Sequence, residues 1–320
     1  MKNETPKFNE QQEAKKTSHS ESVHVPEAEE SKMHIECPEQ QEAVDRALAE
    51  LITSFETLGI ENVKLPNVTI EFVVSENNEF PELGRVGEAH EDGSVVIYYD
   101  QRFKDPAEAE KLVQEIRDSG KDYPGFEQTL KHELAHVAMW SVTRLERQPA
   151  TRLIDEGFAS LVEKTNTQIP IEQTKKEALE GIKNEPENFN RCLNFQHPID
   201  GETENLNEAE YIMGRALLLW IRELKGNDKL LELIQKSPAK TSHNSDKPEG
   251  YDFASTDPEI HKLNNEYISI ITNVNQLPFE QVVEKATEWE GRQFEAALLE
   301  VTGFQDIETV KQEFIKWLNE

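Results

Sequence analysis

The residues His132-Glu133-Leu134-Ala135-His136 carry the most information in this chain of 320 residues. They have the form H-E-x-x-H, in which two histidines one helical turn apart bind zinc and the glutamate acts on a water molecule. On an α-helix the two imidazoles point in directions roughly 40° apart. The opposite side of the helix carries an apolar stripe, formed by Phe126, Leu130, Leu134 and Val137. We therefore predict a helix that buries one side and offers metal ligands on the other.

A third metal ligand must come from another part of the chain, because a catalytic zinc site takes three protein ligands and leaves the fourth position to water. Glu156 is the best candidate. It follows His136 by 20 positions, which is enough for the first helix to end and for a second helix to return beside it. Pro149 is placed to end the first helix, and Thr151 is placed to cap the second. Gly157, which has no side chain, would let helices approach closely near the metal.

The chain before the motif predicts a small α+β lobe. Apolar residues recur at helical spacing over 43–58, and residues 68–74 alternate as in a half-buried strand. Residues 94–99 form a second expected strand, and the turn pair Asp92-Gly93 precedes it. Together these strands predict a small antiparallel sheet. A further helix is expected over 105–120, since proline favours the first helical position.

Composition and pattern divide the chain into three parts. Residues 1–36 are polar and acidic, with few large apolar side chains, so we expect a disordered tail. Residues 37–125 form the α+β lobe, and residues 126–320 form a mainly helical lobe that would bind zinc, with an active-site cleft between them. The expected fold class is therefore α+β. In the second lobe, helices fit 151–164, 207–225, 228–236 and 278–319, with an exposed loop at 237–259.

The charge of the chain restricts its partners. A formal net charge of −29 disfavours nucleic acids and anionic membranes, because their phosphates would be repelled. No run approaches the roughly 18 apolar residues of a membrane span, and no apolar segment follows the first residues as in a secretory signal. We expect a cytoplasmic protein, although export by a dedicated secretion machine would leave no such mark. Cys37 and Cys192 are expected to be reduced thiols.

The motif, taken with Asp155-Glu156-Gly157-Phe158-Ala159, resembles the gluzincins, which are the thermolysin-like and zinc-aminopeptidase-like metallopeptidases. The resemblance extends over residues 94–320. It implies a zincin-like fold, one Zn²⁺ ion and a peptide or protein substrate. It also implies that the glutamate before the glycine, Glu156, joins His132 and His136 as a metal ligand.

Farther along, Tyr211-Ile212-Met213-Gly214 is similar to the aminopeptidase segment Tyr-x-x-Gly, whose tyrosine stabilises an oxyanion. Two departures from the family pattern matter. The chain has no Gly-x-Met-Glu-Asn motif to hold a free amine, so an endopeptidase is expected rather than an aminopeptidase. Ser160 stands where thermolysin-like enzymes carry an aspartate that orients a histidine ligand. The support for that histidine must therefore be weaker or come from elsewhere, with Asp155 and Glu163 as candidates.

The implied mechanism assigns roles to single residues. Glu133 would take a proton from water as it attacks the peptide carbonyl and later pass a proton to the leaving amine. Tyr211 would donate to the developing oxyanion. Arg215, one turn beyond Tyr211, either shares the cleft wall and meets substrate or serves as a structural ion-pair partner. An exposed strand of the 84–100 hairpin would pair with extended substrate backbone.

Two other functions remain open. One is a zincin-fold binding or regulatory protein with little hydrolysis, which the intact Glu133 disfavours. The other is a zinc hydrolase that acts on a non-peptide amide or an epoxide. The other histidines show no ligand spacing, and Trp140 and Trp220 are interpreted as core residues.

Overall fold

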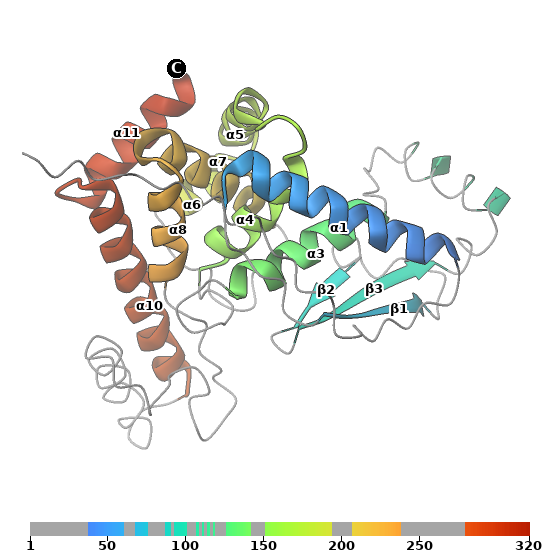
Figure 1. The fold of residues 1–320 in the computed structure, drawn as a ribbon. Helices are drawn as coiled ribbons and strands as arrows, with labels where there is room; N and C mark the ends of the chain where they lie inside the picture. Colours follow the sequence, from blue (N-terminus) through green and yellow to red (C-terminus); the bar gives the residue numbers. More distant parts are fainter. Residues whose placement is uncertain are drawn as a thin grey trace, which may run out of the picture.

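The computed structural model describes residues 38–60, 68–75, 87–90, 93–100, 126–141, 151–193, 207–237 and 279–320, together with residues 107, 108, 111, 114, 115 and 118. The expected tail at 1–36 lies outside these residues, as does the predicted loop at 237–259 apart from Ser237. The described part is α+β: it is mostly helical, with a three-stranded sheet (Figure 1). No helix in this part is both long and apolar enough to cross a membrane.

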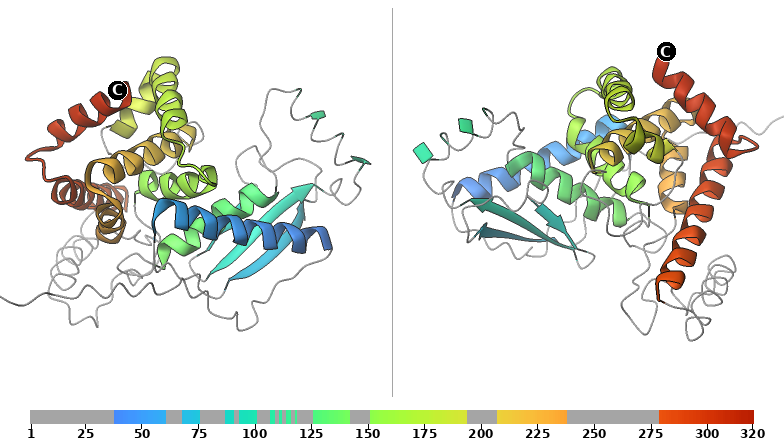
Figure 2. Two further views of the ribbon diagram at one scale, coloured as in Figure 1. Left: turned by 45° about the horizontal axis from the view of Figure 1, so that its top comes forward. Right: turned by 180° about the vertical axis from the view of Figure 1, so that it is seen from behind.

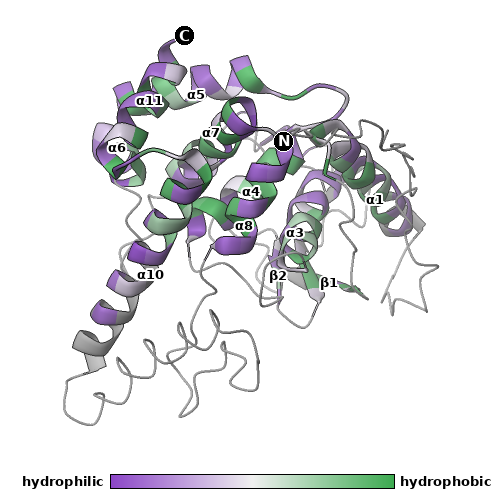
Figure 3. Ribbon diagram, turned by 60° about the vertical axis from the view of Figure 1, so that its left-hand side comes forward, coloured by the Kyte–Doolittle hydropathy of each residue, from purple (hydrophilic) through white to green (hydrophobic). Residues whose placement is uncertain are grey.

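Most of the predicted helices are confirmed. The motif lies on α3 (Phe126–Trp140), and α4 (Arg152–Lys164) follows it. The others are α1 (Pro38–Leu58), α7 (Asn207–Lys225), α8 (Asn227–Lys236), α10 (Phe279–Thr302) and α11 (Ile307–Asn319). Hydrophilic and hydrophobic residues interleave along α1 and α10 (Figure 3), as expected for helices that bury one side. Of the predicted helix over 105–120, only scattered residues are described.

Two helices were not predicted, α5 (Ile171–Asn184) and α6 (Pro186–Leu193). Helix α5 carries a partly buried apolar stripe, formed by Ile171, Ala178, Leu179 and Ile182, and this usable signal was missed. Helix α6 has 8 residues, which is too short for a helical period to stand out. Both helices owe their position to packing against α7 and against each other.

The sheet consists of β1 (Thr69–Ser75), β2 (Gly87–Ala89) and β3 (Ser94–Asp100), in the order β1-β3-β2. The predicted hairpin is present: β2 and β3 are antiparallel, and Gly93 in the turn has a φ of 82°. However, β1 runs parallel to β3, so the prediction of an antiparallel sheet is wrong and the sheet is mixed. Alternating apolar residues indicate which face of a strand is buried, but they carry no information on its direction.

Helices α1 and α3 cover one face of this sheet (Figures 1 and 2). The strands contribute alternate buried residues, among them Ile70, Phe72, Val95 and Ile97. The predicted stripe of α3 is buried at Leu130, Leu134 and Val137. Packing this stripe inward leaves the opposite side of α3, which carries the histidines, facing α4.

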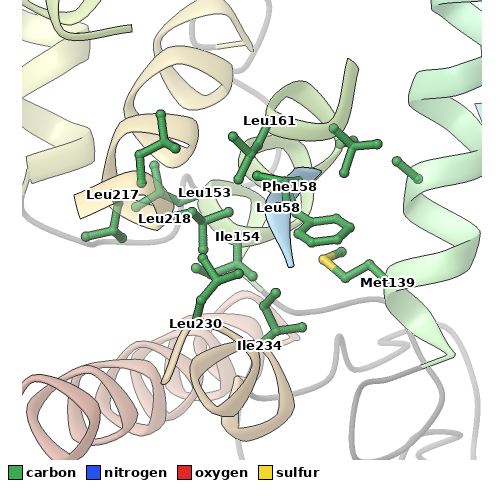
Figure 4. Packing of buried hydrophobic residues seen from close by; sticks show 14 of the residues in the cluster. Leu58, Met139, Leu153, Ile154, Phe158, Leu161, Leu217, Leu218, Leu230 and Ile234 are labelled. Atoms are coloured by element: carbon green, nitrogen blue, oxygen red, sulfur yellow. The ribbon is translucent and has the colours of Figure 1, made fainter. Parts of the chain in front are cut away.

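Helix α4 lies at the centre of the core. Its residues Leu153, Ile154, Phe158 and Leu161 lie among apolar residues of α3, α7 and α8 (Figure 4). Helix α4 also crosses α7 in very close contact, because a Cβ built on Gly157 would lie 2.4 Å from the carbonyl carbon of Gly214. The predicted close approach at Gly157 is therefore confirmed, and its partner is the glycine of the Tyr-x-x-Gly segment.

The two ends of α4 are fixed differently. At its start, Thr151 occupies the expected N-cap position, but its side chain makes no capping hydrogen bond, so the predicted cap is wrong. At its end, the buried Lys131 of α3 donates from Nζ to the carbonyl oxygens of Thr165 at 2.9 Å and of Glu163 at 3.3 Å. The last carbonyls of a helix have no partner within it. Lys131 satisfies two carbonyls at this end, those of Glu163 and Thr165, and holds the end of α4 beside the motif helix.

Candidate metal centre

The three predicted ligands come together between α3 and α4. His132 and His136 bring their Nε2 atoms to 3.2 Å from each other. The Oε2 atom of Glu156 lies 3.4 Å from the Nε2 atom of each histidine. Within the described part of the chain, these three side chains are the group whose ligand atoms could hold one ion.

The spacing of these donor atoms fits a tetrahedral ion. Donors bound at 2.0–2.1 Å to a tetrahedral zinc are separated from each other by roughly 3.3–3.4 Å. The observed separations are 3.2 Å and 3.4 Å, without any movement of the side chains. The exposed fractions are also low, at 13% for His132, 7% for His136 and 12% for Glu156. Two imidazole nitrogens and one carboxylate oxygen are a donor set that zinc accepts.

Each histidine has its own carboxylate at the other ring nitrogen. His136 Nδ1 lies 2.9 Å from Asp155 Oδ1, and His132 Nδ1 lies 3.1 Å from Glu163 Oε2. Because a carboxylate only accepts, the proton of each imidazole belongs on Nδ1, which leaves the Nε2 lone pair for a metal. Both candidates named for this support are thus in place. Ser160, the position that departs from the thermolysin pattern, does not contribute to it.

Trp140 supports the site as well as the core. It is buried, as predicted, but its Nε1 also donates to Asp155 Oδ1 at 2.9 Å. The same oxygen therefore accepts from both Trp140 and His136. Two donors on one oxygen fix the direction of the Asp155 carboxylate, and through it the imidazole of His136.

The pKa values of the candidate ligands are shifted by their contacts with one another. Burial lowers the pKa of His132, but the hydrogen bonds to Glu156 and Glu163 outweigh it and raise the pKa to about 9. For Glu156, burial raises the pKa, whereas the hydrogen bonds from His132 and His136 bring it well below its usual value. A cation that binds here replaces protons held between these groups, because metal ligands must be deprotonated.

Glu133 lies on the same helix, close to β2. A Cβ built on Gly87 would lie 2.7 Å from Glu133 Cγ, so the strand backbone touches this side chain directly. Burial raises the pKa of Glu133, although the neighbouring histidines lower it. A raised pKa makes a glutamate a stronger base.

Tyr211 also reaches the site, from the first turns of α7. Its ring stands edge-on to that of His132, with centroids 5.5 Å apart. Burial raises the pKa of Tyr211 well above its usual value, and the negative charge of Glu156 raises it further. The phenol therefore stays protonated and is able to donate a hydrogen bond.

Arg215 is buried and bound by other side chains. It is 2% exposed and donates to Thr174 Oγ1 at 3.0 Å and to Ser160 Oγ at 2.7 Å. It also forms an ion pair with Glu177. Of its two interpretations, the structural ion pair is confirmed, and a side chain that is 2% exposed has little surface to offer a substrate.

Two further charged residues at the site were missed. Arg152 Nη2 lies 3.2 Å from Glu156 Oε1, and Arg152 Nε donates to Glu210 Oε2 at 2.9 Å. The spacing of four residues between Arg152 and Glu156 was a usable signal, since such pairs meet on one helix face. No sequence signal pointed to Glu210, which comes from α7, 58 positions after Arg152.

The chain matches no family model, no curated protein and no solved structure. The assignment of a metal centre therefore depends on the geometry of its own residues.

Proposed function

We propose that the protein is a zinc-dependent metallopeptidase of the gluzincin type, with a zincin-like fold. One observation carries the proposal: three donor atoms of His132, His136 and Glu156 lie 3.2–3.4 Å apart, with Glu133 on the same helix as the histidines. A zinc ion held there would supply a positive charge that polarises a carbonyl group and acidifies water.

The side chains around this centre have the properties that peptide hydrolysis needs. Glu133 accepts a proton from the attacking water and later passes a proton to the leaving amine. Tyr211 donates from its protonated phenol to the carbonyl oxygen as negative charge develops on it. Asp155 and Glu163 hold the two imidazoles in the required tautomer.

Strand β2 supports an extended peptide as the substrate. It is the last strand in the order β1-β3-β2, and its backbone touches Glu133 at Gly87. A peptide added beside β2 would gain main-chain hydrogen bonds with little sequence preference. This favours an endopeptidase, in keeping with the missing Gly-x-Met-Glu-Asn motif.

Metal analysis combined with cleavage of a denatured protein mixture tests the proposal. The unsubstituted protein should bind one zinc ion and cleave the mixture. Glu133→Gln should keep the ion and lose turnover by orders of magnitude, while Glu156→Ala should lower the zinc content. A protein that binds zinc but leaves the mixture uncut would instead be a binding protein or a hydrolase of small molecules. A protein without bound zinc would refute the proposal altogether.

A further inference from the structure

The two carboxylate oxygens of Glu156 have different surroundings. Oε2 faces the histidines, 3.4 Å from each Nε2 atom. Oε1 faces the other way and lies 3.2 Å from Nη2 of Arg152. The carboxylate therefore presents one oxygen to the candidate metal position, and its second oxygen is engaged by a cation.

Arg152 is itself held in place. Its Nε donates to Oε2 of Glu210 at 2.9 Å, and Glu210 is only 4% exposed. Since the guanidinium is planar, fixing Nε on Glu210 also fixes the direction in which Nη2 points. Arg152 is the first residue of α4 and Glu210 lies in the first turn of α7, so the contact joins the two helices that carry Glu156 and Tyr211.

We propose that Arg152 is a positioning residue that keeps Glu156 as a one-oxygen ligand, with Glu210 holding the guanidinium in register. This inference rests on the metal centre of the proposed function. A carboxylate with both oxygens available is able to bind a metal through both and occupy an extra coordination position. Engaging Oε1 prevents this and preserves the open position that a catalytic site requires.

A purely structural clamp between α4 and α7 would explain the contact less well. The two helices already meet at Gly157 and Gly214, and Arg215 of α7 also donates to Ser160 of α4. The charges of Arg152 and Glu210 cancel, so the pair orients Glu156 with no net charge added beside the ion. This cancellation allows Arg152 to be removed at constant net charge.

The experiment uses Co²⁺ as the metal probe in the full-length chain. Affinity is measured by competition with a chromophoric chelator, and coordination by the visible absorption of bound Co²⁺, which weakens as ligands are added. The charge-balanced variant Arg152→Met/Glu210→Gln removes the contact with Glu156. Arg152→Lys keeps the positive charge without the planar fork. Glu210→Gln alone is the control: the amide oxygen of glutamine still accepts from Arg152 Nε and keeps the guanidinium beside Glu156, whereas the ion pair between the two helices is lost.

We expect the charge-balanced variant to bind Co²⁺ roughly 10- to 100-fold more weakly and with a weaker visible band, as removal of groups that orient metal ligands usually does. The Co²⁺ affinity of Arg152→Lys should lie between those of the charge-balanced variant and the unsubstituted protein. The affinity of Glu210→Gln should stay close to that of the unsubstituted protein. An unchanged affinity and spectrum in the charge-balanced variant would overturn the inference. So would an equal loss in Glu210→Gln, which would identify a helix clamp. Failure of the unsubstituted protein to bind Co²⁺ would refute the metal centre itself, and hence the proposed function.

Discussion

Gly157 of α4 lies directly against Gly214 of α7, and neither position has space for a side chain. A Cβ on Gly214 would come within 2.0 Å of the carbonyl oxygen of Leu153, and a Cβ on Gly157 within 2.4 Å of Gly214. Both contacts are with backbone, which cannot rotate away as a side chain would. The crossing therefore fixes how close α7, with Tyr211, comes to α4, with Glu156.

Gly157→Ala should destabilise the protein by about 1–3 kcal/mol, because an added methyl group forces the two backbones apart. Urea unfolding measures the change. Gly291→Ala on α10 is the matched control, since a Cβ there meets nothing within 4 Å. Because Gly291 lies inside a helix, the Gly291→Ala variant should be more stable than the unsubstituted protein by roughly 0.5–1 kcal/mol. Equal stability of the two variants would contradict the tight crossing.

Asp155→Asn should weaken zinc binding by roughly 10- to 100-fold, because it removes the carboxylate that fixes the tautomer of His136. Glu163→Gln should act in the same way through His132. Zinc affinity is measured by chelator competition, with Glu172→Gln on the exposed side of α5 as a control for lost charge. If all three variants bound zinc alike, the carboxylates would not orient the histidines.

Gly87→Ala should reduce turnover without loss of zinc. The new methyl group would meet Cγ of Glu133 at 2.7 Å and displace the proposed base. A misplacement of about 1 Å can lower a rate by roughly 10²-fold. The measurement is peptide cleavage alongside zinc content, with Gly291→Ala as a variant that gains the same group elsewhere. Full turnover in Gly87→Ala would show that β2 does not fix Glu133.

The thiol of Cys192 should resist alkylation up to high pH. Burial raises its pKa from 9.0 to about 12, so the folded protein keeps the thiol protonated where an unfolded chain ionises. At pH 9, iodoacetamide should react roughly 10²- to 10³-fold more slowly with folded than with urea-unfolded protein, in a Cys37→Ser background. The stability that depends on this neutral thiol is complete below pH 9 and is lost as the pH rises towards 12. Equal rates in the two states would contradict the burial of Cys192.

The sequence predicted the candidate ligands because their chemistry depends on local spacing. His132 and His136 are one turn apart, and Glu156 lies on the next helix, so neither relationship requires knowledge of the whole fold. The roles of Asp155 and Glu163 followed from the same short segment. The helices with strong apolar stripes were predictable for the same reason.

The remainder depends on contacts between distant segments. The direction of β1 relative to β3 follows from how residues 69–100 connect, which a periodic pattern does not contain. Glu210 meets Arg152 only because α7 packs on α4. Helix α5 is an exception, because its stripe of Ile171, Ala178, Leu179 and Ile182 was a local signal that was missed.

The first turns of α4 leave natural selection little freedom. The carbonyl of Leu153 lies at the crossing with α7, and the side chain of Ile154 is buried in the core. Asp155 orients the imidazole of His136, and Glu156 offers a carboxylate oxygen to the candidate metal position. Gly157 allows the backbone of α7 to approach closely. Five successive positions therefore carry five separate constraints, and a single replacement among them is rarely neutral. Relatives of this protein that keep the proposed metal centre should vary elsewhere first, and substitutions in this segment would be an early sign that the centre has been lost.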